Sequence, residues 1–292
     1  MIKSTLTLAR HGQDNGYAVP AVNVFDDVSL RAVVGAAVDH SSPLIVQVSV
    51  KTVREVGLTL ITEMFRAVAS DAPVPLALHL DHCPDLAVAR SVIDAGWSSL
   101  LLDMSASPLD EALRETEKIV QLAHATGVDV ESEIENILGV EDGVGSNEGG
   151  NGYTIETLAD AAERTGADLL APQLGTAHGA YSAPPSLTPE RARNLVRLSG
   201  RPVVLHGGTG LTDEDFRLFI DAGVSKINIS TAVKVSYIAG LRETLDASPS
   251  VSDPLRLLRA AEQSVRSEIS KHILVFGAAG HASAASAFEV TR

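Results

Sequence analysis

The sequence predicts an α/β fold in which eight parallel strands close into a barrel surrounded by helices, a (β/α)8 or TIM barrel. Short runs rich in Val, Ile, Leu and Ala alternate eight times with longer segments of helical periodicity, and no low-complexity linker separates them. The 292 residues divide into eight units of about 36 residues, close to the unit size of such barrels, which typically have ~250 residues. Runs such as LIVQV and SSLLLD are apolar on both faces, as is typical of parallel strands covered by helices.

The apolar runs place the strands in chain order. We expect them at Ala18–Val24, Leu44–Val48, Leu76–Asp81, Ser99–Asp103, Asp129–Glu133, Asp168–Pro172, Val203–Leu205 and Lys226–Ile229. A doubly wound open sheet is the alternative. That fold normally has a glycine-rich turn after its first strand, whereas AVNVFDDVSL contains no glycine.

The helical periodicity between these runs predicts eight helices. They are expected near Ser29–His40, Leu58–Ser70, Leu86–Asp94, Leu109–Thr126, Ile155–Thr165, Glu190–Leu198, Asp213–Asp221 and Thr231–Leu245. A glycine follows four of them shortly before a strand, at Gly96, Gly127, Gly166 and Gly223. Glycine at this place is typical of a helix end.

We expect residues 1–292 to form a single catalytic domain with a C-terminal helical extension at about residues 246–292. Two connections are too long to be simple turns. They are Ile134–Tyr153 after the fifth strand and Gln173–Pro189 after the sixth. Long loops of this kind in a barrel usually cover or bind a ligand.

Composition excludes several classes of protein. The chain has 23 Lys and Arg against 37 Asp and Glu, a net charge of −14, which disfavours nucleic acids and anionic membranes as partners. A single cysteine, Cys83, excludes an internal disulfide and fits a reducing compartment. No apolar run reaches the roughly 20 residues that span a bilayer, and the N-terminus has no signal-peptide pattern. We therefore expect a cytoplasmic protein.

Polar residues gather at the carboxyl ends of the expected strands. The third strand ends in HLDHC with His79, Asp81 and His82, the fourth ends at Asp103, and the fifth ends in ESE with Glu131 and Glu133. Barrel enzymes keep their active sites on this face. His82 lies one step beyond the face that His79 and Asp81 share, at the rim of the barrel.

Three histidines from different strand ends can converge on a metal. His82, His178 and His206 would provide three ligands and an open position, the ligand set of catalytic zinc. Their separations of 96 and 28 residues match no local metal motif. For any one histidine taken alone, a hydrogen-bonded structural role is the simpler interpretation.

The segments VLHGGTGL and NIST follow the seventh and eighth strands, where barrels commonly bind phosphate. Glycines allow the backbone to approach an anion closely, and a helix N-terminus adds a favourable dipole. Glycine pairs also serve as tight turns, so the position after the seventh strand is what favours a phosphate site.

With these segments the sequence resembles the class II, metal-dependent ketose-bisphosphate aldolases over nearly the whole chain. The resemblance rests on LALHLDHC, SSLLLDMS, VESEI, GVED, GTAHGAYS, VVLHGGTG and KINIST, in this order. Glu135 and Leu138 depart from the family pattern, which usually has glycine at the first position and glycine or methionine at the second.

The resemblance implies a role for individual residues. It assigns His82, His178 and His206 to catalytic zinc, and Asp103 and Glu133 to a second or alternative divalent metal or to orienting a ligand histidine. It assigns proton transfer at the C4 oxygen to Asp81 and at the dihydroxyacetone phosphate carbon to Glu141. The positions that match substrate-binding residues are Asn23, Gln47, Ser49, Gly179, Gly207, Gly208, Thr209, Asn228, Thr231 and Arg259. A monovalent cation, Na⁺ or K⁺, often binds beside the phosphate in the family.

The implied activity is reversible cleavage of fructose- or tagatose-1,6-bisphosphate to dihydroxyacetone phosphate and glyceraldehyde 3-phosphate. Zinc would stabilise the enediolate as a Lewis acid. No Schiff-base lysine is then required, and the lysine of the expected strands, Lys226, lies at a strand's N-terminal end. The alternatives are an aldolase of another phosphorylated ketose or deoxy-sugar acid, a non-catalytic sugar-phosphate-binding subunit, and a metal-dependent hydrolase.

The resemblance also implies a homo-oligomer, a homodimer or homotetramer. Arg259 matches an arginine that family members donate across a subunit interface to the distal phosphate. A guanidinium group suits this task because it presents a planar fork of donors.

Overall fold

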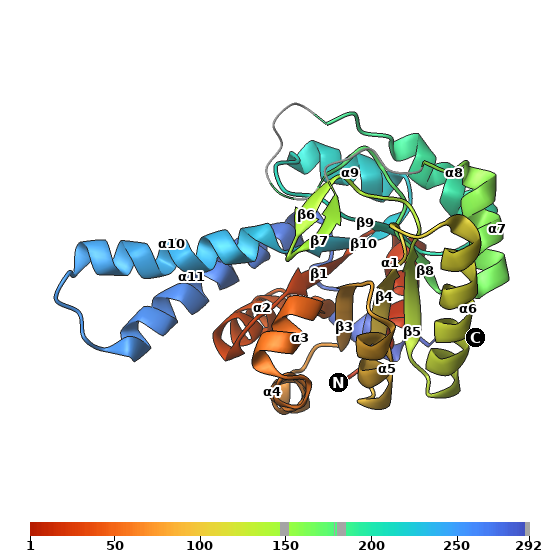
Figure 1. The fold of residues 1–292 in the computed structure, drawn as a ribbon. Coiled ribbons are helices and arrows are strands. Elements are labelled where there is room, and N and C mark those ends of the chain that lie inside the picture. The colour runs from red at the N-terminus through yellow and green to blue at the C-terminus, as the bar shows by residue number, and fades with distance from the viewer. Residues whose placement is uncertain (147–151, 178, 180–184, 290–292) are drawn as a thin grey trace.

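The computed structural model contains a closed barrel of eight parallel strands, which confirms the predicted (β/α)8 fold (Figure 1). Around the barrel the strands follow the order β1-β10-β9-β8-β5-β4-β3-β2. The structure describes residues 1–146, 152–177, 179 and 185–289, with the backbone alone for residues 140–141 and 144–146.

Every barrel strand overlaps a predicted one. The strands are β1 Val19–Asn23, β2 Leu44–Ser49, β3 Leu76–Cys83, β4 Ser99–Asp103, β5 Asp129–Glu133, β8 Leu169–Leu170, β9 Val203–Leu205 and β10 Val224–Ile229. β8 is shorter than expected and stops before Pro172, which has no backbone N–H for a ladder bond. β10 begins two residues early, so Lys226 lies inside the strand and not at its N-terminal end.

The eight predicted helices are also present. They are α2 Asp27–Asp39, α4 Leu58–Asp71, α5 Leu86–Asp94, α6 Leu109–Ala125, α7 Ile155–Thr165, α8 Pro189–Ser199, α9 Asp213–Asp221 and α10 Thr231–Ala247. The glycines at their C-terminal ends have φ values of 71°, 81°, 75° and 99°, a left-handed backbone that favours glycine.

Further elements precede, interrupt or follow the eight strand–helix units. They are α1 Thr5–Asn15, α3 Val50–Val56, the antiparallel strands β6 Gly139–Glu141 and β7 Val144–Ser146, α11 Pro254–Val275 and α12 Ala282–Ala287. α1 closes the amino-terminal end of the barrel, where Leu6 and Ala9 pack against Leu101, Leu169 and Val204.

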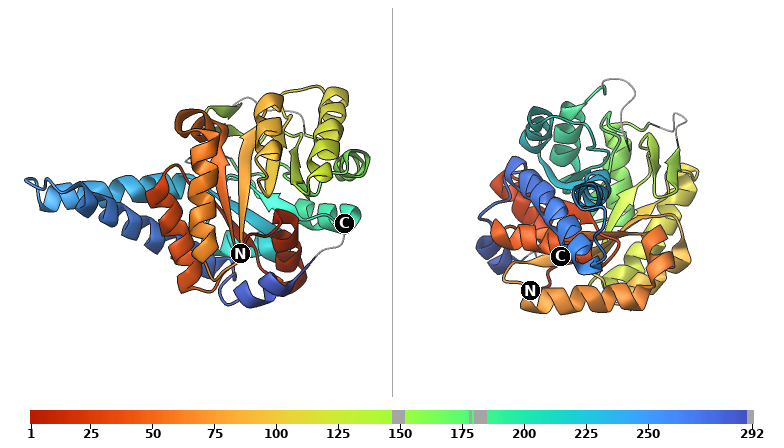
Figure 2. Two further views of the ribbon diagram at one scale, coloured as in Figure 1. Left: turned by 90° about the horizontal axis from the view of Figure 1, so that it is seen from below. Right: turned by 90° about the vertical axis from the view of Figure 1, so that its left-hand side faces the viewer.

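α10 and α11 form a long antiparallel pair that projects from the barrel as an arm (Figures 1 and 2). Part of α11 packs on α2, while the remote end stands clear of the barrel. Five large apolar side chains of α10 and α11 are exposed: Val235, Ile238, Leu245, Leu255 and Leu274. None of the helices in the described residues combines the length and apolar character that a membrane span requires.

Candidate active site

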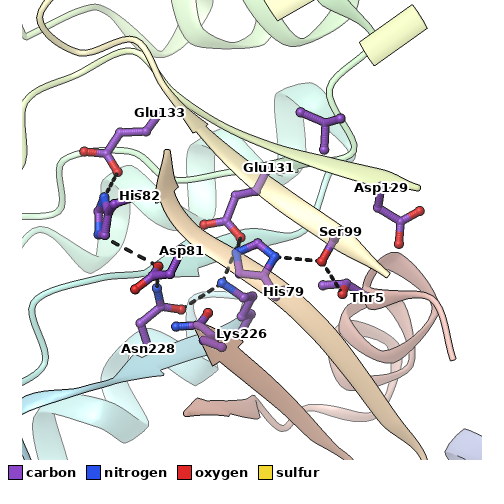
Figure 3. Close-up of polar contacts among 12 residues, drawn as sticks. Thr5, His79, Asp81, His82, Ser99, Asp129, Glu131, Glu133, Lys226 and Asn228 are labelled. Atoms are coloured by element: carbon purple, nitrogen blue, oxygen red, sulfur yellow. Dashed lines mark hydrogen bonds and ion pairs between the residues drawn. The ribbon is translucent and has the colours of Figure 1, made fainter. Parts of the chain in front are cut away.

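The polar side chains predicted from the strand ends meet inside the carboxyl end of the barrel (Figure 3). β3 contributes Asp81 and His82, β5 contributes Glu133, and β10 contributes Asn228, all of them buried. The barrel thus brings together groups up to 147 residues apart in the sequence, such as the bonded pair Asp81 and Asn228.

His82 reaches this site because of a local irregularity in β3. The pairing of β3 with β4 shifts register between Leu80 and Cys83, as at a β-bulge. His82 has φ 43°, in the left-handed region that non-glycine residues rarely adopt. The bulge places His82 beside Asp81, with His82 Nε2 4.0 Å from Asp81 Oδ1. Bulges often re-aim a side chain at an active site, and such strain is typical of functional positions.

Of the three histidines predicted to bind metal, His82 and His206 are described, and their imidazoles face each other. Nε2 of His82 lies 3.0 Å from Nδ1 of His206. The outer nitrogen of His206 is 2.8 Å from Glu131, and that of His82 is 3.4 Å from both Asp103 and Glu133. A carboxylate that holds the outer nitrogen of an imidazole is the usual support of a metal-bound histidine. Imidazole and carboxylate groups suit zinc, so these side chains fit the predicted metal.

Metal-binding groups occur in two overlapping sets within the described residues. Asp81, His82 and His206 form one set, and His82, Asp103 and Glu133 form the other. In each set the candidate ligand atoms lie within 4.8 Å of one another. The second set contains the two carboxylates predicted for a second metal or for orienting a histidine.

Burial and neighbouring charges set the protonation of these groups. Burial would lower the pKa of His82, but Asp81, Glu133 and Asp103 raise it well above its usual value. Burial raises the pKa of Glu133, and the nearby Asp103 raises it further. Burial lowers the pKa of His206 to about 4, although its bond to Glu131 acts in the opposite direction. His206 is therefore neutral at pH 7 and able to bind a metal.

Asp81 is held by two amides. Asn23 Nδ2 donates to Asp81 Oδ2 at 2.8 Å, and Asn228 Nδ2 donates to Oδ1 at 3.1 Å. Gln47 lies behind this pair and donates to the side-chain oxygen of Asn23 at 2.9 Å. The structure thus brings Asn23, Gln47 and Asn228 together at Asp81, with Gln47 one contact further from it.

A buried ion pair that was not predicted from the sequence contacts His206. Lys226 Nζ is 2.8 Å from Glu131 Oε2, and both side chains are fully buried. Burial alone would raise the pKa of Glu131, but Lys226 and His206 hold it well below its usual range. Period-two alternation places Glu131 on the same face as Glu133, and this was the available signal. The pair supports His206 from below and also positions Asn228, which accepts from Lys226 at 2.8 Å.

In the predicted phosphate loop after β9, the backbone lies close to neighbouring groups. Gly207 has φ 68°, and a Cβ atom there would lie 2.6 Å from the carbonyl carbon of Ala177. A Cβ atom at Gly208 would lie 3.0 Å from the ring of Phe216. Thr231 begins α10, whose N-cap residue Ser230 is buried and makes no side-chain capping bond. The close contact at Gly207 thus requires glycine, and the N-terminus of α10 is a place where an anion can bind.

A cavity of about 420 Å³ opens beside Asp81: its lining includes Asn23, which donates to Asp81, but not Asp81 itself. Its charged and polar lining residues are Asn23, Ser49, Lys51, Thr52, Glu55, Asp142, Lys234 and Tyr237. Ser49 also caps α3 through the backbone N–H of Thr52. The cavity is large enough for the aldehyde half of a sugar phosphate.

Several predicted residues lie away from this cluster or outside the described part of the chain. His178 lies outside the described residues, although Gly179 next to it is included and has φ 80°. The backbone of Glu141 lies in β6, and its side chain is outside the described part of the chain. Thr209 lies in the loop after β9, beside Gly208. Arg259 is exposed on α11 and does not line the cavity.

Glu135 anchors the two long loops to each other. Its fully buried carboxylate accepts hydrogen bonds from the backbone N–H of Tyr153 at 2.7 Å and of Gln173 at 2.9 Å. Arg191 donates to the same carboxylate at 2.6 Å and to the carbonyl oxygens of Tyr153 and Gln173. Glu135, at a position where the family usually has glycine, thus links the bases of both loops.

We expect Glu135→Gln to lower the free energy of unfolding by about 1–3 kcal/mol, because the new amide hydrogens would face buried donors. Urea denaturation measures the change. Glu190→Gln removes an exposed partner of Arg193 in α8 and should change stability by less than about 0.5 kcal/mol. Equal stability of Glu135→Gln and the wild type would refute the anchor.

Comparisons with known proteins agree with this geometry. Residues 3–281 match the family model described as fructose-bisphosphate aldolase class-II. The chain is 34% identical to fructose-bisphosphate aldolase of Geobacillus stearothermophilus, over 96% of this chain and 98% of the relative. It is 32% identical to sulfofructosephosphate aldolase of Alkalicoccus urumqiensis, over 93% of this chain and 95% of that protein. The crystal structure of the YdjI aldolase from Escherichia coli K12 superposes with a TM-score of 0.86 at 27% identity, covering 97% of this chain and all of that one.

Proposed function

Because the chain belongs to the class II fructose-bisphosphate aldolase family, a family of lyases, we propose that it reversibly cleaves fructose- or tagatose-1,6-bisphosphate. The products are dihydroxyacetone phosphate and glyceraldehyde 3-phosphate. The observation that supports this most strongly is the pair of facing nitrogens of His82 and His206, each imidazole backed by carboxylates.

His82, His178 and His206 hold the catalytic zinc in this proposal. When bound there, zinc supplies Lewis-acid polarisation of the ketone and hydroxyl oxygens of the sugar. Asp103 and Glu133 keep His82 oriented or receive a second divalent ion, since both lie 3.4 Å from its Nδ1. A monovalent cation, Na⁺ or K⁺, sits beside the phosphate loops.

The substrate lies between the phosphate loops and the cavity beside Asp81. Gly179, Gly207, Gly208, Thr209 and Thr231 bind the phosphate of the ketose half through backbone and hydroxyl donors. Asn228 contacts the substrate from its position beside Asp81, to which its side-chain amide donates. The distal half enters the cavity lined by Asn23 and Ser49.

Two carboxylates move the protons. Asp81 takes the proton from the C4 hydroxyl as the C3–C4 bond breaks, and Asn23 and Asn228 hold its two oxygens in place. Glu141 delivers a proton to the dihydroxyacetone phosphate carbon. Removal of either carboxylate therefore affects a different half of the reaction.

We expect Glu141→Ala to slow proton exchange between solvent and dihydroxyacetone phosphate by about 10²-fold, the lower range for general acid–base catalysis. Zinc content should not change. Exchange is measured by NMR in deuterated water, with Glu148→Ala, seven residues further along the sequence, as the control. Loss of zinc from Glu141→Ala would show that this carboxylate binds metal.

The sugar is identified by a substrate panel. Dihydroxyacetone phosphate release is compared for fructose-1,6-bisphosphate, tagatose-1,6-bisphosphate and sulfofructose phosphate. The last is included because one relative is a sulfofructosephosphate aldolase. We expect the highest kcat/KM for a bisphosphate; a higher value for the sulfonate would move the proposal to that ketose.

We propose that the protein acts as a homodimer or homotetramer in which Arg259 reaches the distal phosphate of a neighbouring subunit. The projecting arm supports this, because Arg259 stands on it and its apolar side chains are exposed. Arg259→Met should raise KM for a bisphosphate about tenfold, the loss of one charged hydrogen bond. Sedimentation gives the assembly state, and a fully active monomer would contradict the proposal.

We also propose that the whole chain works as one catalytic domain in the cytoplasm. Its single cysteine and the matched aldolase relatives support this. Fractionation of cells that express a tagged chain tests the location.

A further inference from the structure

One ion pair joins the tip of the β6–β7 hairpin to the first turns of α10. Lys234 Nζ lies 2.8 Å from Asp142 Oδ1, across 92 residues of sequence. The Asp142 side chain is 18% exposed and that of Lys234 is 38% exposed, so water screens the pair only in part. Both residues line the cavity beside Asp81.

The turn of this hairpin has a defined geometry. Asp142 and Gly143 connect the two strands, with φ values of 49° and 87°. Positive φ at both central residues is the requirement of a type I′ turn, for which Asp-Gly is a preferred sequence. Glu141 pairs with Val144 directly across this turn. A displacement of Asp142 therefore displaces the backbone of Glu141.

The other described attachment of the hairpin lies at its base. Leu138 forms a parallel bridge with Ala177, in the loop after β8. Ala177 in turn contacts Gly207. Within the described residues the base is thus fixed by backbone, and the tip by the Lys234 side chain.

α10 itself is fixed at the same level. Tyr237, one turn after Lys234, donates to Asp26 Oδ2 at 2.7 Å, and its ring packs edge-on against Phe25. Thr231 begins the helix at the phosphate loops. α10 therefore offers a rigid support between the phosphate loops and the hairpin.

We propose that Lys234 is a positioning residue that holds the β6–β7 hairpin against α10 and so sets the place of Glu141 during proton transfer. This inference rests on the proposed function of Glu141. Lys234 acts through Asp142 and not on the substrate, although it borders the same cavity.

The test compares kcat, KM and the proton exchange of dihydroxyacetone phosphate. For a partly exposed ion pair we expect Lys234→Met to lower kcat and proton exchange about fivefold, with KM within twofold and zinc content unchanged. Asp142→Asn should give the same loss, because asparagine tolerates the left-handed turn and removes only the charge. The double variant should lose no more than either single one.

Rescue and control variants separate positioning from general structure. Lys234→Arg keeps the cation and should restore kcat to within twofold. Lys118→Met, which removes an exposed partner of Glu115 on α6, should leave all rates unchanged. Amide hydrogen exchange of residues 139–146 should be about fivefold faster in Lys234→Met.

Each contrary result has a distinct meaning. A KM raised tenfold at unchanged kcat would overturn the proposal, because Lys234 would then bind a substrate anion. Unchanged hydrogen exchange and kcat in Lys234→Met would also overturn it. Faster hydrogen exchange together with a fully active Glu141→Ala would retain the hairpin contact and reject the role of Glu141 instead.

Discussion

His206→Ala is expected to abolish zinc retention and aldol cleavage together. The imidazole supplies a nitrogen 3.0 Å from that of His82, and a methyl group cannot replace it. Metal polarisation contributes several kcal/mol to such reactions. Because about 1.4 kcal/mol corresponds to tenfold in rate, cleavage should fall by about 10³-fold or more.

Zinc content after dialysis, measured by atomic absorption, and the rate of dihydroxyacetone phosphate release test this prediction. His124→Ala is the matched control, because His124 also bonds a buried carboxylate, Asp168 at 2.9 Å, at the start of β8. It should keep both zinc and activity. If His206→Ala fails to fold, as seen by circular dichroism, His206→Gln replaces it. Full zinc content and activity in a folded variant would contradict the metal assignment.

Asp81→Asn is expected to lower kcat by about 10²–10⁴-fold, the usual contribution of a positioned acid–base group. An amide cannot take the proton of the C4 hydroxyl, and its NH2 would face Asn23 or Asn228, which both donate to Asp81. KM should change little, and zinc should stay bound through the histidines.

Steady-state kinetics with zinc analysis measures the effect. Asp85→Asn is the control, because Asp85 follows the same strand but caps α5 and pairs with Arg54. Its kcat should match the wild type. Loss of zinc in Asp81→Asn would show that the carboxylate is a metal ligand and not the base. A change in KM alone would show that it only binds substrate.

Apolar runs such as LIVQV and SSLLLD were sufficient to predict the barrel, because parallel strands covered by helices on both faces are rich in apolar residues. Ser99–Asp103, for example, begins and ends where the sequence placed it. α1 was missed because TLTLARHGQDN carries few apolar residues. Its contacts with the barrel stabilise it, including Leu6 N, which donates to Asp129 at 2.8 Å.

The position of the site was predictable from the sequence, but the contacts among its residues were not. Strand ends placed Asp81, His82 and His206 at one end of the barrel, and the structure joins them. The bulge at His82 depends on how β3 pairs with β4, and the period-two alternation of the sequence carries no information about this pairing. The buried pair of Glu131 and Lys226 required the closure of the barrel, since these residues are 95 apart in the sequence.

The contacts that fix the two long loops were likewise not predictable from the sequence. Their lengths predicted a functional role, but the shared anchor at Glu135 arises only when Arg191 on α8 packs between them. The Asp-Gly pair at the tip of the β6–β7 hairpin was a usable turn signal. Its partner Lys234 could not be found from the sequence, because the contact spans 92 residues.

Zinc-dependent aldol cleavage is tested by dihydroxyacetone phosphate release from fructose- and tagatose-1,6-bisphosphate by the chelator-treated protein, before and after zinc is restored. We expect no cleavage without metal and recovery in proportion to bound zinc. Cleavage that survives complete removal of metal would contradict it. So would a protein that binds zinc and releases inorganic phosphate without aldol cleavage, which would instead indicate a hydrolase.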